Sequence, residues 1–254
     1  DPQNRTSLRK VAFGQREYHV RIVRQPDGTI RRISAYDEYV APKRTSLLKD
    51  TREFFFTREG MSRPLPARPN LARVMTSTST QELIERVFSE APGLVIGESQ
   101  DRIASMQFLL ENMPALAAQE VKTLYFHRLL NDFNQLDLDE FFNTGRMDSD
   151  LQACLDDLQT DPSGRFTPLA VVKAARANGI RVQATDCMAS YRYPGLTMTE
   201  LEEQAVKTYL THTIMDADKA LNGPGKWVVL TDQGNVNTLR NLPGISELQG
   251  GIGL

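Results

Sequence analysis

Short apolar runs alternate with longer amphipathic stretches along most of this chain. Residues 94–96 and 124–126 are apolar runs, each followed at once by polar residues, and a stretch of helix length with an apolar face separates them. This alternation predicts a β-α-β unit. Because the two strands of such a unit are parallel and joined by a right-handed crossover, their polar ends should lie at the same edge of a sheet.

The same pattern continues toward the end of the chain. Residues 180–185 and 227–231 predict a third and a fourth strand, separated by stretches with helical periodicity. Residues 79–82 and 199–202 read Ser-Thr-Gln-Glu and Thr-Glu-Leu-Glu, which are capping boxes that predict helix starts. We therefore predict an α/β fold over residues 76–254, with a mostly parallel central sheet flanked by helices.

The first part of the chain follows a different pattern. Residues 18–23 and 29–34 alternate apolar and polar positions around a Pro-Asp-Gly turn, which predicts a β-hairpin. Residues 63–69 read Arg-Pro-Leu-Pro-Ala-Arg-Pro, and three prolines in seven residues exclude a regular helix or a central strand. We interpret this stretch as a linker, so that residues 1–75 form a basic N-terminal extension and residues 76–254 the α/β domain.

The charge is distributed unevenly, although the net charge is only −2. Residues 1–75 hold 16 Lys/Arg against 8 Asp/Glu, whereas residues 76–254 hold 14 against 24. A basic extension can contact an anionic membrane surface, but an ordinary solvated surface or a leader segment fits the pattern equally well. We do not expect nucleic-acid binding, because no aromatic side chains are interleaved with the basic residues to form a groove.

Other features of the sequence narrow the class of protein. No apolar run approaches 18 residues, so we expect no transmembrane helix. The chain starts at Asp1 with neither a methionine nor the apolar core of a secretory signal, which suggests a processed or truncated chain. Cys154 and Cys187 lie in different contexts and predict neither a disulfide nor a metal framework.

Polar side chains collect where the four predicted strands end. These candidates are Glu98, Ser99 and Gln100 after the first strand, His127 and Arg128 after the second, Asp186, Cys187 and Tyr191 after the third, and Asp232, Gln233 and Asn235 after the fourth. Strand ends are also polar simply because they leave the core. Convergence of titratable groups from separate strands nevertheless favours a functional cleft at this edge of the sheet.

The chemistry of these side chains suggests acid/base catalysis. His127 is the candidate base, with Glu98 or Asp186 as the carboxylate that orients it. Arg128 would hold an anionic substrate or oxyanion, and we expect the other candidates to bind substrate, namely Ser99, Gln100, Cys187, Tyr191 and Asn235. One histidine with two carboxylates lacks the spacing of a metal site, and Ser99 lacks the second glycine of a hydrolase nucleophile turn. We expect no metal and no cofactor.

Several blocks of the sequence resemble a known family. These blocks are Gly97-Glu98-Ser99, Leu124-Tyr125, residues 186–191, Lys226-Trp227 and residues 243–254. In order and spacing they resemble bacterial effector and toxin domains, namely the C-terminal part of the Pasteurella mitogenic toxin and its relatives, which share the erythromycin-esterase and ChaN-like fold. Within this family the sequence is also similar to the HopBA type III effectors of plant pathogens, which implies that residues 1–75 hold delivery and host-targeting sequence.

Three histidines of the family pattern are absent. The family reads Gly-Glu-Ser-His where this chain has Gln100, and its Glu-His pair is here His127-Arg128. Its Gly-Asn-Ser-His block is replaced by residues 232–235, Asp-Gln-Gly-Asn. The matching positions that remain are Glu98, Asp186, Cys187, Tyr191 and Asn237. An esterase mechanism that uses a histidine at the position of Gln100 as its base is not implied here, because the Gln100 amide cannot accept a proton.

The resemblance implies a virulence effector or toxin that a bacterium secretes into host cells, where it acts in the cytoplasm or at a membrane surface and triggers cell death. Its divergent hydrolase-like site would lie at the carboxyl edge of the sheet. One alternative is a catalytically inactive effector that binds host proteins. Another is a haem-binding or metal-binding ChaN-like protein. The partner would be a host protein or a small-molecule substrate of unknown identity, and not a nucleic acid.

The basic extension generates the first testable prediction. Each Lys or Arg near an anionic bilayer contributes about 1 kcal/mol of attraction, and salt screens it. Vesicles that contain anionic lipid should therefore sediment the protein at about 0.05 M salt and release it at about 0.5 M. Vesicles of neutral lipid serve as the control. Sedimentation that does not change with salt, or that fails with anionic vesicles, would contradict an electrostatic contact.

Overall fold

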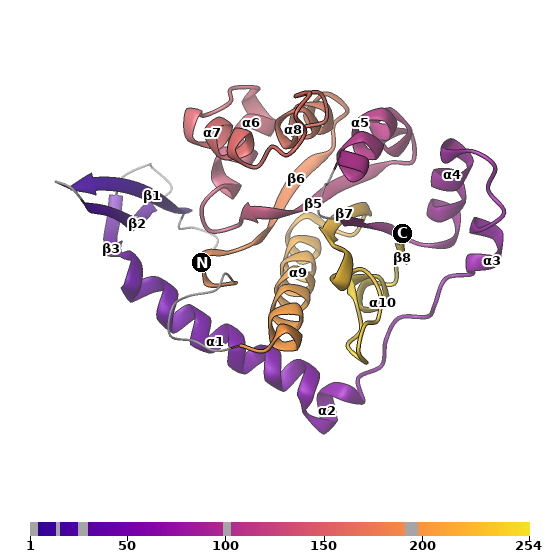
Figure 1. Cartoon of the computed structure of the whole chain (residues 1–254), viewed down its shortest axis with the longest axis horizontal. Helices are drawn as coiled ribbons and strands as arrows, with labels where there is room; N and C mark the ends of the chain where they lie inside the picture. Colours follow the sequence, from indigo (N-terminus) through magenta and orange to yellow (C-terminus); the bar gives the residue numbers. More distant parts are fainter. Residues whose placement is uncertain (1–4, 14–15, 25–29, 99–102, 191–197) are drawn as a thin grey trace.

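The computed structural model of the protein describes residues 5–13, 16–24, 30–98, 103–190 and 198–254. A sheet forms the middle layer, and helices cover both of its faces (Figure 1). This arrangement confirms the predicted α/β fold with a parallel sheet flanked by helices. The finer resemblance to the erythromycin-esterase fold stays a prediction.

Within the described residues, five parallel strands form the central sheet in the order β6-β5-β7-β4-β8. The strands are β4 (Gly93–Glu98), β5 (Val121–Leu130), β6 (Arg181–Asp186), β7 (Lys226–Asp232) and β8 (Ile252–Gly253). The sequence predicted all of them except β8. This short strand pairs with β4 at the end of the chain, where the Leu254 N–H donates to the Val95 carbonyl at 2.9 Å.

Helices on the two faces of the sheet bury alternate residues of each strand. The first layer consists of α4 (Thr80–Glu90), α5 (Ile103–Ala118), α6 (Gln135–Thr144), α7 (Ser149–Asp157) and α8 (Pro168–Ala177). The second layer contains α9 (Glu200–Asn222) and α10 (Ile245–Gln249). Leu94 and Ile96 belong to the first core, whereas Val95 packs with Met215 and Trp227 in the second. Burial on both faces explains why the strands read as continuous apolar runs.

Side-chain caps start the helices that the sequence predicted. The Thr199 hydroxyl accepts from the Glu202 N–H at 3.2 Å, and the Glu202 carboxylate accepts from the Thr199 N–H at 3.0 Å, so the capping box of α9 is complete. At α4 the Ser79 hydroxyl accepts from the Glu82 N–H, but the Glu82 carboxylate accepts from the Thr78 N–H instead. Both helices therefore begin at the predicted residues.

The N-terminal residues form a separate antiparallel sheet that leads into a long helix. Its strands are β1 (Arg5–Phe13), β2 (Arg16–Arg24) and β3 (Ile30–Ala35). Pairing of β2 with β3 confirms the predicted hairpin, and its predicted turn at residues 25–28 lies outside the described residues. The sequence analysis did not predict β1.

Helix α1 (Tyr36–Phe56) crosses the N-terminal half of α9 and packs against it there (Figure 1). Val40 is buried in a cluster with Val206 of α9. The Arg44 side chain is also buried, and its Nε donates to the Ala189 carbonyl at 2.9 Å. A helix that precedes residue 75 thus shares a core with the α/β part, while the division of the chain at that residue stays a prediction.

The predicted linker contains neither helix nor strand. Residues 62–70 leave α2 (Arg58–Met61) and run as a coil to α3 (Leu71–Val74), along the outside of the molecule in Figure 1. The proline content of this segment explains the lack of regular structure. None of the described helices is long and apolar enough to cross a membrane.

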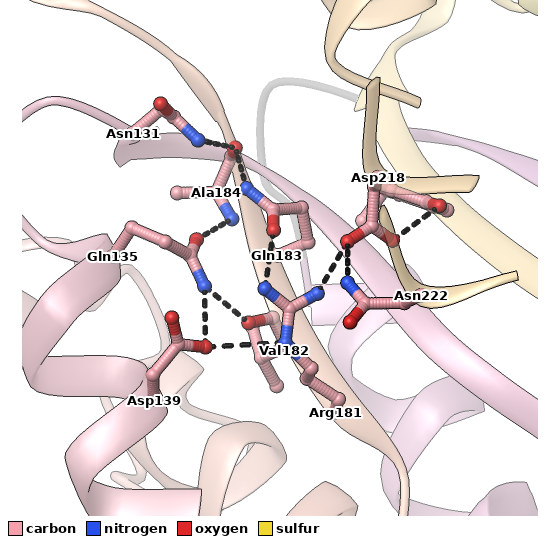
Figure 2. A network of polar contacts seen from close by, with 10 residues as sticks. Asn131, Gln135, Asp139, Arg181, Val182, Gln183, Ala184, Asp218 and Asn222 are labelled. Carbon is pink, nitrogen blue, oxygen red and sulfur yellow. Dashed lines mark hydrogen bonds and ion pairs between the residues drawn. The ribbon is translucent and has the colours of Figure 1, made fainter. Parts of the chain in front are cut away.

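Side chains of α6 cover the free edge of β6, which lies at the end of the sheet. Figure 2 shows Gln135 reaching the backbone of this strand, where its Nε2 donates to the Val182 carbonyl at 3.2 Å and its Oε1 accepts from the Ala184 N–H at 2.7 Å. The Asn131 amide donates to the Ala184 carbonyl at 3.4 Å. These bonds take the place of a neighbouring strand, which blocks the edge against pairing with another chain.

Arg181, at the start of β6, joins helices from both layers (Figure 2). Its Nε lies 3.1 Å from Asp139 of α6, and its Nη1 lies 2.7 Å from Asp218 of α9. Asp218 also accepts from the Tyr125 hydroxyl and the Asn222 amide, each at 2.8 Å. Burial raises the pKa of Tyr125, and its hydrogen bond to Asp218 raises it further. The network ties the edge strand to both helical layers.

Removal of Asp218 should therefore destabilise the fold. We expect Asp218→Ala to lower the free energy of unfolding by about 2–4 kcal/mol, because it removes at once the acceptor of the Arg181 Nη1, the Tyr125 hydroxyl and the Asn222 amide. Tyr125→Phe, which deletes one hydrogen bond and keeps the charge pair, should cost about 1 kcal/mol. Urea unfolding followed by circular dichroism measures both values. Equal losses for the two variants would contradict this account of the network.

Candidate functional site

The carboxyl ends of the strands bring the predicted side chains together. Along the sheet, these residues follow in the order Asp186 at the end of β6, His127 just after the regular pairing of β5 stops at Phe126, Asp232 at the end of β7 and Glu98 at the end of β4. Glu98 lies in register with Asp232, so β4 and β7 end at the same level. Ligand sites of open α/β sheets lie at this edge. We call these four residues and Arg128 the rim.

His127 and Glu98 form the closest contact of the rim. The His127 Nε2 lies 2.6 Å from the Glu98 Oε2. Strand β7 separates β4 from β5, so the two side chains meet across the end of β7. The Glu98 side chain is fully buried and that of His127 is 6% exposed. A buried carboxylate needs a hydrogen-bonded partner, and the imidazole supplies it.

This contact fixes the role of each ring nitrogen when Glu98 is ionised. An ionised carboxylate can only accept a hydrogen bond, so Nε2 carries the proton that faces Glu98. In the neutral ring Nδ1 then has the free lone pair. The Nδ1 atom lies 3.8 Å from the Asp232 carboxylate, on the side away from Glu98. It is therefore the ring atom that can take up a proton.

Two cations flank the carboxylates of the rim. The Arg128 Nη1 is 3.8 Å from the Glu98 carboxylate, and the Arg128 Nη2 donates to the Leu158 carbonyl at 2.9 Å. The Lys207 Nζ of α9 is 2.7 Å from the Asp232 carboxylate. The Lys207 and Asp232 side chains are 42% and 39% exposed, in contrast to the buried pair. The rim therefore opens to solvent on the Asp232 side.

Asp186 supports the backbone of the rim. The pairing of β5 with β6 shifts register after Phe126, and Arg128 has φ of +70°. The Asp186 Oδ2 accepts from the Arg128 N–H at 2.7 Å, which stabilises this left-handed conformation of a non-glycine residue. Of the two carboxylates predicted to orient His127, it is Glu98 that contacts the ring, while Asp186 holds the bend that follows it.

Cys187 and Asn235 point into the protein. Cys187 is 1% exposed and packs with residues of α1 and α9, and burial raises the pKa of its thiol. Asn235 is also buried, and its Oδ1 accepts from the Thr208 hydroxyl at 3.4 Å. Their predicted role in substrate binding stays a prediction. Ser99, Gln100 and Tyr191 lie outside the described residues.

Lys207, which pairs with Asp232 of the rim, is the residue of the site that the sequence analysis missed. It lies within α9, two turns after the capping box, in a stretch that reads as an ordinary amphipathic helix. No strand end marks it, so only the packing of α9 against the sheet reveals it.

Within the part of the chain that the structure describes, no three His, Cys, Asp or Glu side chains are arranged to hold a metal ion. A cavity of about 890 Å³ lies apart from the rim. Its lining includes Arg52 and Glu53 of α1, Gly60 of α2 and Glu202 of α9.

Solved structures provide the comparisons with known proteins, since no protein-family model and no curated protein matches the sequence. RRSP, a MARTX toxin effector domain from Vibrio vulnificus, has a TM-score of 0.68 and 19% identity over 90% of this chain and 47% of its own. The C-terminal region of Pasteurella multocida toxin has a TM-score of 0.60 and 17% identity over 82% and 29%. The type III effector HopBA1 has a TM-score of 0.52 and 12% identity over 74% and 84%.

These structural neighbours confirm the resemblance to bacterial effector and toxin domains at the level of the fold. At sequence identities of 12–19% these similarities show a shared fold and do not show a shared reaction. The chain spans about half the length of the solved RRSP chain that it matches.

The burial of Cys187 predicts that its thiol reacts slowly with alkylating reagents. In a Cys154→Ser background at about pH 8, we expect Cys187 to react with iodoacetamide about a hundredfold more slowly in the folded protein than in denaturant. A raised pKa lowers the thiolate fraction at this pH, so the rate should rise only at more alkaline pH. Mass spectrometry of timed samples measures the rate. Alkylation of the folded protein as fast as that of a free cysteine would contradict the prediction.

Proposed function

We propose that this chain is a virulence effector or toxin domain that a bacterium delivers into host cells. The domain carries out hydrolase-type acid/base chemistry at the rim and leads to the death of the host cell. The fold shared with RRSP, Pasteurella multocida toxin and HopBA1 supports the effector class. The single observation that carries the catalytic part is the buried contact of 2.6 Å between His127 and Glu98 at the carboxyl edge of the sheet.

In this proposal His127 is the general base. Glu98 holds the Nε2–H and fixes the orientation of the ring, so that Nδ1 takes a proton from a water molecule or hydroxyl as it attacks the substrate. The substrate approaches from the exposed Asp232 side, where Lys207 provides a positive charge for an anionic group. Arg128, close to Glu98, balances the charge of the buried carboxylate.

The structural neighbours also suggest a different nucleophile. The C-terminal region of Pasteurella multocida toxin is described as having a thiol-protease-like catalytic triad. In this chain Cys187 is buried against α1 and α9, and its thiol has a raised pKa, which argues against an analogous role. The acid/base pair is therefore the better-supported centre.

Substitutions that keep the shape of the pair test the proposal. His127→Gln and Glu98→Gln retain hydrogen-bonding groups but cannot accept the proton or hold the charge. We expect each to lower the rate of the reaction about 10²–10⁴-fold, seen as a matching increase in the dose needed to kill host cells. Delivery of purified protein over a dilution series measures the dose.

Glu111→Gln on α5 is the matched control, because it removes an exposed carboxylate away from the rim. Equal expression and equal melting temperatures have to be confirmed for all variants. Full toxicity of both rim variants would overturn the catalytic part and leave a catalytically inactive effector that binds host proteins. Loss of toxicity only where the melting temperature falls would also count against catalysis. Absence of toxicity in the parent chain would contradict the effector assignment.

A further inference from the structure

The coil between α2 and α3 contains a segment whose conformation is set by proline. We call residues 63–69 the proline segment. Its prolines are Pro64, Pro66 and Pro69, and each fixes its own φ near −65°. The residue before a proline is kept out of the helical region, which restricts three further positions. Only Ala67 is unrestricted, so the sequence strongly favours a polyproline II helix even before any partner binds.

The segment is accessible in the folded protein. All of its residues are exposed except Pro69, which is half-buried, and Leu65 is 41% exposed. In the part of the chain that the structure describes, no backbone hydrogen bond joins residues 64–69 to the rest of the protein. Its backbone groups therefore remain free to pair with water or with a partner.

Few contacts hold the segment on the surface. The Arg63 N–H donates to the Gly60 carbonyl at 3.2 Å at its start, and the remaining contacts are weak ones made by side chains. The Arg63 guanidinium lies 3.5 Å from the centre of the Phe54 ring, a cation-π contact worth about 0.5–1 kcal/mol at an exposed site. Pro66 lies against Gly250, where an added Cβ would be 3.1 Å from the proline Cβ. Small cavities of about 260 and 180 Å³ lie beside the segment, so it is not tightly packed. A partner can lift it at little cost.

All charged side chains of the proline segment and its flanking residues are positive. Residues 60–81 contain three arginines and no acidic residue, although the chain as a whole carries a net charge of −2. Two of these arginines, Arg63 and Arg68, belong to the proline segment. Among the described residues neither forms an ion pair, whereas the third, Arg73, pairs with Glu90. Positive side chains beside exposed proline favour a partner with an acidic surface.

The spacing of the arginine and the prolines identifies the partner. Arg63, Pro66 and Pro69 follow one another at intervals of three, and a polyproline II helix has three residues per turn, so they share one edge. The pattern is Arg-x-x-Pro-x-x-Pro, in which Leu65-Pro66 and Arg68-Pro69 are the two x-Pro units that fill aromatic-lined grooves. The second unit has Arg68 where an apolar residue is usual, and its aliphatic stem can cover the groove.

We propose that the proline segment is a docking site for an SH3 domain. The Leu65-Pro66 and Arg68-Pro69 units would occupy the two aromatic grooves of that domain, and Arg63 would pair with its acidic pocket. The preference of the prolines for the polyproline II conformation reduces the entropy lost on binding. This site contains none of the rim residues and involves no acid/base chemistry, so a test of it does not depend on the proposed catalytic function.

Titration of a purified SH3 domain with the intact protein tests the proposal. The probe is a ¹⁵N-labelled tyrosine-kinase SH3 domain that accepts Arg-x-x-Pro-x-x-Pro peptides, and the readout is the shift of its aromatic-groove amide signals. We expect saturable binding by the parent chain. Arg63→Ala should weaken the affinity about tenfold, and the Pro66→Ala/Pro69→Ala double variant should weaken it further.

Pro64→Ala is the matched control, because it removes an exposed proline from the same segment outside the Pro-x-x-Pro core. It should bind within about threefold of the parent chain. Binding that survives the double variant would overturn the proposal, and so would binding to a WW domain with no response from the SH3 domain. A free peptide of residues 60–72 that binds while the intact protein does not would also overturn it, because the segment would then be held by the domain. Equal melting temperatures exclude misfolding as a cause.

Discussion

Both faces of the parallel sheet have to be covered by helices, because its strands carry apolar side chains on each side. Leu94 and Val95 are neighbours in sequence but belong to different cores, one under α4 to α8 and one under α9 and α10. A helix has to cross from one strand to the next for the strands to run parallel. All carboxyl ends consequently meet at one edge, and polar residues from distant parts of the chain come together there. The candidate site follows from this arrangement.

Polar side chains have different roles at two edges of the sheet. At β6, side chains of α6 replace the missing neighbour strand, and Arg181 bridges the helical layers. At the carboxyl edge, the buried Glu98 is paired with His127, while Asp232 and Lys207 remain open to solvent. The first set of contacts closes a surface that could aggregate, and the second leaves one that can meet a substrate. The polar network at β6 thus stabilises the fold, whereas the polar residues at the carboxyl edge remain partly accessible.

The basic N-terminal part contributes more than charge. Helix α1 buries Arg44 and Val40 against the α/β part, next to the turn that follows β6. The proline segment then carries the chain away from α2 along the outside of the molecule with few contacts (Figure 1). Tight packing of α1 and loose packing of the segment suit different tasks, since a core helix supports the fold and an exposed polyproline II segment can be recognised by another protein.

The sequence by itself determined the α/β class, four of the strands, the helix starts at Ser79 and Thr199 and the hairpin, because each depends on local periodicity or on a cap within a few residues. Strand order was not accessible, since the pairing of β7 between β4 and β5 depends on contacts between residues more than a hundred positions apart. The short β8 had no periodicity to reveal it.

The same distinction holds for the rim. Its location followed from parallel strands sharing an edge, and Glu98 and His127 were both among the predicted residues. Only the tertiary structure decided three contacts. Glu98 orients the His127 ring, Asp186 supports the backbone of Arg128, and Lys207 faces Asp232. Distances of a few ångströms between side chains depend on how strands twist and helices pack, and no local pattern in the sequence encodes them.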